Sequence, residues 1–545
     1  MRIDVAGFLG ANTQLHKLLL ADGVGTQSLN QAPGRGDLRP WRQPLTVADA
    51  PADRKTIYRM GRATASDTLY WLSWASIVHV VRGFDREDTQ ERTYFTGAAG
   101  GPAWTDNVMA IAGGSYPASS RPLGMPAPTS PPLLSIASAG VSTQQVDRWV
   151  CTTFVNDIGW ESAPSPPAKI TANTDATLKL SGLEAKPAGN YEINRRRIYM
   201  TQTGATGATE FFFLAEIAYT SGAQEWTQVA EVLSNDVLAT QTTLGGWLPC
   251  PADAKCLTQL WNGMAAVISG KGIRPCVANV IYAYPLDYEI VIADQPVAMA
   301  TWGQNLLVLT TGIKPSLITG QDPASLSEQP MDGLQFNGAC LSVQSVVSLG
   351  HGVCWACPDG LGYMGSSGGK LVTAGLIHPD EWRAMKPDTM VGGLFMGLFL
   401  AFYNDGAGWK GFAIDPTNPT GVFYLSSGYP AAYADPLTGS LFVLDGAVIK
   451  KWDAGAALMS AKFRSKAYRM PSCNMGYGRV IADAYPVTLR LVADGAITAT
   501  TTVVDDGVFS LPGGYEAQVW QLEGETSGGA ITSMHAAETP EELLE

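Results

Sequence analysis

One glycine-rich stretch has the spacing of a dinucleotide-binding fingerprint. Gly406, Gly408 and Gly411 fit the pattern GxGxxG, whose glycines allow a close backbone approach to a pyrophosphate. That chemistry needs a strand before the glycines and a helix after them, because the helix N-terminus holds the anion. Here the apolar run Phe412-Ala413-Ile414 continues as a strand. We therefore expect a hairpin turn at this position and no cofactor-binding site.

A second stretch matches the nucleophile elbow of serine hydrolases. Gly365, Ser367 and Gly369 fit GxSxG, which places a reactive serine on a sharp turn between a strand and a helix. The run Lys370-Leu371-Val372 after the glycines is typical of a strand instead. We expect a loop between two strands, and we assign no catalytic residue here.

Three neighbouring side chains could be taken for a metal site. His351, Cys354 and Cys357 lie close together, but a structural zinc ion needs four ligands. Cys340 is isolated in sequence, and Cys354 and Cys357 would point to opposite faces of a strand. We expect buried, reduced thiols, with a metal site as the less favoured alternative. The chain holds eight cysteines in 545 residues, which is too few for a disulfide scaffold.

Two short charged motifs have simple structural explanations. Arg195, Arg196 and Arg197 form a basic run, and period two sends the middle residue to the face opposite the other two. A surface or salt-bridged strand is favoured there over a phosphate-binding patch. Arg35-Gly36-Asp37 matches a three-residue adhesion motif, but a tripeptide has little specificity and we expect an ordinary loop.

Composition and charge indicate an all-β chain. Apolar residues make up 46% and charged residues 16%, and 59 glycines with 34 prolines indicate many turns. The net charge of −13 disfavours a protein that grips nucleic acid, since such binding depends on lysine and arginine. The start of the chain shows no basic segment followed by a long apolar run, so we expect no signal peptide.

An internal repeat organises the second half of the chain. Apolar strands followed by tight turns start near Met264, Leu306, Val353, Leu398 and Leu441, which by difference are 42 to 47 residues apart. A repeat of about 40–50 residues built of strands is typical of the blades of a β-propeller. Asn-Gly and Asp-Gly turns support hairpins within each repeat. Continuous apolar runs predict strands that are buried on both faces.

The flanking regions differ from this pattern and divide the chain into five parts. We expect an irregular N-terminal segment over 1–55 and the first blade or blades with a Pro-rich linker over 56–135. An inserted β-sandwich of immunoglobulin or fibronectin type follows over 136–245. The remaining blades occupy 246–455, and an antiparallel β domain occupies 456–545. Closing the ring of blades with strands from both chain ends would remove free edges.

Several turn and linker motifs in this order resemble one family. They are Leu29-Asn30 with Gly36-Asp37-Leu38-Arg39-Pro40, Leu123 to Pro128, Gly159 to Pro166, Tyr191 to Tyr199, and Trp261-Asn262-Gly263-Met264 through Pro285-Leu286-Asp287-Tyr288. With them the chain resembles the tail nozzle proteins of short-tailed bacteriophages, also called hub, tail tubular or stabilisation proteins. The resemblance covers most of the chain.

The resemblance implies a structural role without an active site. It implies a homohexameric ring below the portal and adaptor, which continues the DNA channel and contacts tail fibres or spikes. DNA would pass through the lumen without sequence-specific binding. The protein would be made and assembled in the host cytoplasm and would end in the virion. No catalytic, cofactor-binding or metal-binding residue carries over from the family, and no membrane span is expected.

Two other functions remain open at the level of the sequence. The chain holds 15 Trp and 19 Tyr, and exposed aromatic residues on a propeller rim could bind a receptor or a glycan. A propeller hydrolase would need carboxylates or arginines that converge in a central pocket, which spacing in sequence does not reveal. We favour the nozzle, with a receptor- or glycan-binding tail protein as the alternative.

Overall fold

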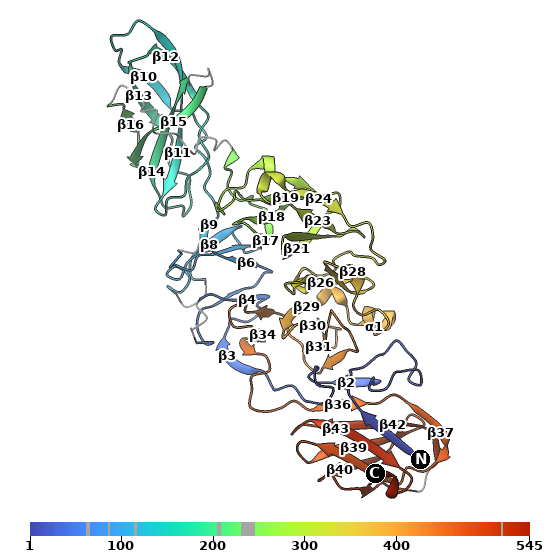
Figure 1. Cartoon of the computed structure of the whole chain (residues 1–545). Helices are drawn as coiled ribbons and strands as arrows, with labels where there is room; N and C mark the ends of the chain where they lie inside the picture. Colours follow the sequence, from blue (N-terminus) through green and yellow to red (C-terminus); the bar gives the residue numbers. More distant parts are fainter. Residues whose placement is uncertain are drawn as a thin grey trace. The chain divides into compact units, whose positions relative to one another are not determined.

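The computed structural model describes residues 1–61, 66–84, 88–113, 117–203, 209–229, 246–513 and 516–544. Strands dominate these residues, and the helices among them are short (Figure 1). These helices are α1 (Pro379–Ala384), η2 (Leu286–Tyr288), η3 (Pro323–Ser325), η4 (Val343–Ser345), η5 (Pro387–Thr389) and η6 (Glu541–Leu543).

The chain forms two compact units. Unit 1 comprises Met1–Ile77, Asp294–Ile318 and Gln329–Glu545, and unit 2 comprises Val78–Ala293 and Thr319–Glu328. Each unit contains small antiparallel sheets in which a strand pairs with the next one along the chain.

Small meander sheets follow one another in the second half of the chain. The first sheet consists of β21 (Pro296–Trp302), β22 (Asn305–Thr310), β23 (Ser316–Thr319) and β24 (Ser327–Pro330). The second consists of β25 (Val347–Ser348), β26 (Gly352–Cys357), β27 (Gly360–Gly365) and β28 (Gly368–Leu371). The third contains β29 (Val391–Phe395), β30 (Leu398–Asn404), β31 (Trp409–Ile414) and β32 (Phe423–Leu425). Successive sheets touch through their first strands, β21 against β25 and β25 against β29. The first strands therefore lie innermost, as in propeller blades. The fold is an all-β propeller, as the repeat predicted.

One blade combines strands from distant parts of the chain. β33 (Ala432–Ala434), β34 (Leu441–Asp445) and β35 (Val448–Lys451) pair in order, and β3 (Leu45–Asp49) completes the sheet beside β35. β3, from the N-terminal part of the chain, thus completes a blade whose other strands lie more than 380 residues later, and closure of the ring by both chain ends stays a prediction. The short hairpin β4 (Thr56–Arg59) and β5 (Trp71–Trp74) follows, with β4 against β33.

The continuous apolar runs are buried on both faces, as expected. Every residue of β26 is buried, and so are the five residues of β30 from Phe399 to Tyr403. In β34 only the last residue, Asp445, is exposed. A blade stacked between two others leaves neither face to water, so period-two alternation is absent.

Unit 2 contains two more blade-like sheets and an insertion between them. The first sheet is β6 (His79–Arg82), β7 (Thr93–Thr96), β8 (Ala103–Thr105) and β9 (Arg121–Pro122), and the second is β17 (Lys255–Gln259), β18 (Ala265–Ser269), β19 (Gly272–Pro275) and β20 (Ile290–Val291). β6 contacts β17, so these two sheets also meet through their first strands.

The insertion is a pair of sheets around a shared core. One sheet has the order β10-β13-β16, with β10 (Leu133–Ser138), β13 (Thr177–Leu183) and β16 (Gln224–Thr227). The other has the order β12-β11-β14-β15, with β12 (Ala168–Asn173), β11 (Gln145–Asn156), β14 (Ile193–Thr203) and β15 (Thr209–Ala218). Val150, Leu178 and Ile198 pack together between them. The kinship with immunoglobulin or fibronectin domains stays a prediction, and its predicted end at 245 lies outside the described residues.

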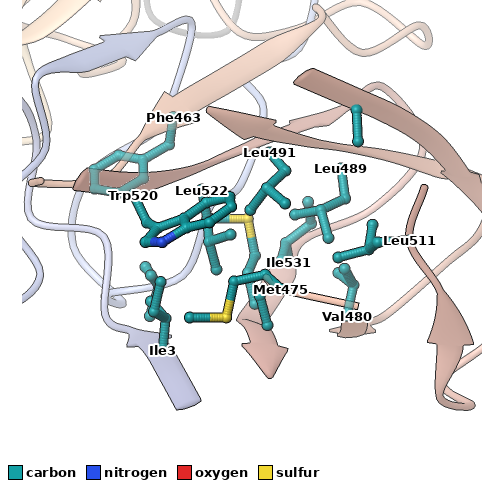
Figure 2. Close-up of a cluster of buried hydrophobic side chains, with 14 of the residues drawn as sticks. Ile3, Phe463, Met475, Val480, Leu489, Leu491, Leu511, Trp520, Leu522 and Ile531 are labelled. Atoms are coloured by element: carbon teal, nitrogen blue, oxygen red, sulfur yellow. The ribbon is translucent and has the colours of Figure 1, made fainter. Parts of the chain in front are cut away.

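The C-terminal module of unit 1 is built on a large apolar core. Its strands are β1 (Arg2–Ala6), β36 (Ala461–Arg464), β37 (Tyr468–Cys473), β38 (Tyr477–Ala482), β39 (Val487–Ala493), β40 (Ala496–Val503), β41 (Phe509–Ser510), β42 (Ala517–Thr526) and β43 (Ile531–Ala537). Figure 2 shows Ile3 of β1 in one cluster with Trp520 and Leu522 of β42 and Ile531 of β43. All four side chains are at most 1% exposed.

The N-terminal segment is irregular only in part, which corrects the expectation for 1–55. β1 pairs with β43, β3 joins the blade of β35, and β2 (Gln27–Leu29) lies between a blade and the C-terminal module. β2 runs parallel to β32 and antiparallel to β36, which joins both into one ten-stranded sheet (Figure 1). Gln27–Leu29 is too short to show a clear pattern, and its partners lie hundreds of residues away in sequence.

Candidate functional site

The two catalytic-looking glycine motifs lie in hairpin turns. Gly406 and Gly408 connect β30 to β31, both with positive φ, and β31 follows where a helix would be required. Gly365 ends β27 and Gly368 begins β28, so Ser367 lies in a two-residue turn between strands. Both predictions of a turn without the helix that the chemistry needs are confirmed.

The cysteines are buried free thiols. All eight are buried, and Cys354 and Cys357 are fully enclosed in β26. Burial raises the pKa of Cys357 to about 12, so this thiol stays protonated and unreactive. Within the ranges that the structure describes, no three His, Cys, Asp or Glu side chains group so as to hold a metal ion.

The basic run is a salt-bridged strand, as predicted. Arg195 and Arg197 both bind Glu216 across the β14–β15 pair, at 3.0 and 2.8 Å. Arg196 points the other way, is fully buried, donates to the Glu184 carbonyl and lies 5.1 Å from the Phe154 ring. Burial lowers the pKa of Arg196. This run holds the insertion together and offers no open phosphate-binding patch.

Glu161 lies next to the joint between the insertion and the blades of unit 2, and it anchors the loop after β11 to the insertion's own strands. The Glu161 side chain is 1% exposed. It accepts hydrogen bonds from Thr153 Oγ1, Tyr199 OH and Arg197 Nη1, each at 2.6 Å. Burial, together with this carboxylate, raises the pKa of Tyr199 well above its ordinary value. The arrangement fixes the loop after β11 against β11 and β14, and it offers no open position for a substrate.

Aromatic rings complete the same joint. Trp160 stacks on Tyr282 at 4.6 Å between ring centres and lies nearly parallel to Tyr94 at 6.4 Å. A cavity of about 400 Å³ borders these rings together with Phe84 and Arg92. Because the ring faces contact one another, we interpret this cluster as a packed joint rather than an open binding platform.

A second joint lies at Asn30 in unit 1. Asn30 has a left-handed backbone, φ +53, at the end of β2. Its amide donates to the Ser460 carbonyl at 3.0 Å, and its side-chain oxygen accepts from Ser426 N at 2.9 Å. One side chain thus ties the β32 blade to the start of β36.

A cavity of about 600 Å³ lies beside the N-terminal segment in unit 1, and we call it the N-terminal cavity. Its apolar lining includes Phe8, Leu9, Pro33, Met396, Leu398 and Phe423. Its polar lining includes Arg35, Asp37, Asp415, Asn418, Thr420 and Asp453. The cavity contains no nucleophile paired with a base, so its chemistry is that of binding.

The Arg35-Gly36-Asp37 stretch forms part of this wall and is a tethered loop. The Gly36 carbonyl accepts from Phe8 N at 2.9 Å, and Asp37 pairs with Arg39 at 2.9 Å. The prediction of a loop is confirmed. Sequence reasoning missed the cavity, because its walls come from segments near residues 8, 35, 396, 415 and 453.

Two acidic side chains of the polar wall, Asp415 and Asp453, differ in their environments. Burial raises the pKa of Asp415, but hydrogen bonds from Thr417 and Asn418 outweigh it and the pKa lies below its ordinary value. Burial raises the pKa of Asp453, which accepts from Arg42 N at 2.7 Å.

Helices long and apolar enough to cross a membrane are absent from the described residues.

Comparisons with known proteins give only distant likenesses. The chain matches no family model and no curated protein. A computationally designed protein, Ika8, is similar at 9% identity over 75% of this chain and 99% of its own, with a TM-score of 0.29. BamB from Moraxella catarrhalis is similar at 14% identity over 49% and 83%, with a TM-score of 0.24. The WD40 propeller domain of Doa1 is similar at 9% identity over 59% and 88%, with a TM-score of 0.25. Such values say nothing about function.

Proposed function

We propose that this chain is a nozzle protein of a short-tailed bacteriophage tail. In this role it forms a homohexameric ring below the adaptor and portal, continues the DNA channel and carries fibres or spikes. Its place is the virion, after assembly in the host cytoplasm. It acts as a structural part and not as an enzyme.

The observation that supports this role is where the family-like motifs lie. Asn30, Gly124, Trp160 and Trp261 each belong to a stretch that carries the resemblance, and each lies at a joint. Asn30 and Trp160 make the joints described above. Gly124, with φ +95, leaves no room for a side chain beside Pro249. Trp261 Nε1 donates to the Gly320 carbonyl at 2.7 Å, which ties the β17–β18 turn to the segment Thr319–Glu328.

A structural protein requires residues that hold one module against the next, and the residues of the resemblance motifs lie at such joints. An enzyme family would share residues around a reactive pocket, whereas a scaffold shares those that fix module against module.

The net charge of the chain supports the same role. With a net charge of −13 the chain lacks the cationic excess that would hold DNA passing through a channel.

The test is assembly of the purified full chain. We expect negative-stain images and light scattering to show rings, either of the chain alone or after addition of the adaptor protein from the same virion. Removal of fibres or spikes should leave the rings intact. A chain that stays monomeric and fails to bind the adaptor would contradict the proposal.

A further inference from the structure

We propose that the N-terminal cavity binds an uncharged saccharide. This site goes beyond the nozzle role and does not depend on it. Its volume of about 600 Å³ lies within the range of small-molecule sites and accommodates about two to three sugar rings.

The polar wall holds hydrogen-bonding groups that the protein does not use. Within the described residues, neither the Arg35 guanidinium nor the Asn418 side-chain amide has a hydrogen-bond partner, and both residues are exposed. Asp415 bonds Thr417 and Asn418 through Oδ1, and Asp453 bonds Arg42 through Oδ1. The second oxygen of each carboxylate is left for a ligand.

The charges and the hydrogen-bonding types of these wall side chains favour a ligand with hydroxyl groups over an ionic ligand. A sugar hydroxyl both donates and accepts, so it can serve a carboxylate oxygen and a guanidinium at once. Asp37 and Arg39 neutralise each other, which leaves Arg35 against Asp415 and Asp453. An anion would meet two carboxylates, and a cation would meet Arg35.

The apolar wall suits the carbon face of a sugar ring. Leu9 is 36% exposed and Met396, at the β29–β30 turn, is 79% exposed, so these two side chains present the accessible apolar surface, whereas Phe8 and Phe423 are buried. A ring can therefore place its C–H face against the apolar side while its hydroxyls reach the polar side. This division of a pocket into apolar wall and few polar groups is typical of ligand sites.

An extended peptide is a poorer fit for the same cavity. The strands that contribute to its wall are β30 and β32, and each already has a neighbour on both sides. No free strand edge is therefore offered there for a peptide to extend the sheet.

The experiment is a glycan array probed with the full chain, followed by titration of each hit by saturation-transfer NMR. The array carries neutral oligosaccharides, uronic-acid oligosaccharides and a basic peptide. We expect saturable binding of neutral oligosaccharides with millimolar or tighter Kd. Binding of the acidic sugars or the peptide in preference to neutral sugars would overturn the proposal, as would the absence of any binding.

Two variants locate the site without disturbing the fold. The double variant Arg35→Gln/Asn418→Ala removes exposed polar groups, and Met396→Asn removes the apolar rim at a position with φ +51 that asparagine tolerates. Each should weaken binding about tenfold or more while the melting temperature stays that of the unmodified chain. Arg383→Gln is the matched control, 70% exposed in α1 and away from the cavity. Unchanged affinity in both site variants would place the sugar elsewhere and refute the assignment.

Discussion

Within the insertion, one buried carboxylate accepts hydrogen bonds from three donors. Glu161 binds Arg197, Tyr199 and Thr153 with 1% of its side chain exposed. A charge in this position is stable only while its partners remain, because burial removes the solvation that water would supply. The residue is therefore a sensitive probe of how firmly the loop after β11 is held to the insertion.

Glu161→Gln should lower the free energy of unfolding of the chain by about 2–4 kcal/mol, since it leaves Arg197 partly uncompensated and one donor unmatched. Urea denaturation followed by tryptophan fluorescence measures the change. Glu216→Gln is the matched control, because Glu216 binds the same arginine but is 30% exposed and should contribute less than about 1 kcal/mol. Equal losses in both variants would mean that burial does not matter here.

A second residue-scale prediction concerns pH. Burial lowers the pKa of His79 to about 4 from 6.5, and its ring lies 3.6 Å from the Cys256 thiol. A base with a lowered folded-state pKa binds protons more weakly in the folded state than in the unfolded state. The contribution of neutral His79 to the free energy of unfolding is therefore fully present above pH 6.5 and is lost as the pH falls from 6.5 toward 4.

The loss over this range should reach at most about 3 kcal/mol for the native chain. His79→Gln should flatten the acid side of a stability-against-pH curve, and thermal melts between pH 4 and pH 7 measure it. His16→Gln, at an exposed histidine, is the control and should leave the slope unchanged. A His79→Gln chain with the native slope would show that another group titrates.

At the scale of elements, β2 is a three-residue strand that joins two modules. It lies between β32 of a blade and β36 of the C-terminal module, and Asn30 at its end bonds both sides. Cooperative unfolding of these modules depends on this strand, because it is the segment shared by both sheets.

Asn30→Gly should cost about 1–3 kcal/mol, because glycine keeps the left-handed backbone but loses two hydrogen bonds. We expect urea unfolding of unit 1 to separate into two transitions, one for the blades and one for the C-terminal module. Far-UV circular dichroism and hydrogen exchange detect the separation. Asn262→Gly, another left-handed asparagine that bonds only within unit 2, is the control and should leave these two transitions together.

The blades could be predicted from the sequence because their signals are local. The Asp-Gly turn at Asp445-Gly446 and the buried run of β30 belong to different repeats, and each is contained within its own repeat. β2 could not be predicted, because Gln27-Ser28-Leu29 has no alternation and its partners, Tyr424 and Arg464, lie hundreds of residues away. Glu161 was visible only as an acid in a Pro-rich stretch. The N-terminal cavity escaped prediction because segments from five parts of the chain form it.

At the scale of the whole molecule, charge governs how the protein meets DNA. The net charge is −13, and the cations that cluster on β36 and β39 are already paired. Arg464 and Arg490 both bind the buried Glu523. Arg464 and Arg490 are therefore not free to neutralise phosphates.

We expect no retention of double-stranded DNA by the purified chain in a gel-shift assay, even at low salt where such binding is strongest. A variant in which exposed acids are changed, such as Asp332→Lys with Asp380→Lys, should begin to retard DNA at low salt and release it as salt rises. Strong, salt-resistant binding by the unmodified chain would contradict a passive conduit.

The pairing of β2 also has a consequence for synthesis. Leu29 leaves the ribosome 433 residues before Lys462, its partner in β36, by difference of their positions. At about 5–20 residues per second, translation takes roughly 20–90 s to cover that interval. During that time the nascent chain carries a strand with no neighbour on that side. Prematurely terminated chains would keep this edge open, which would distinguish them from finished chains before assembly into the proposed ring.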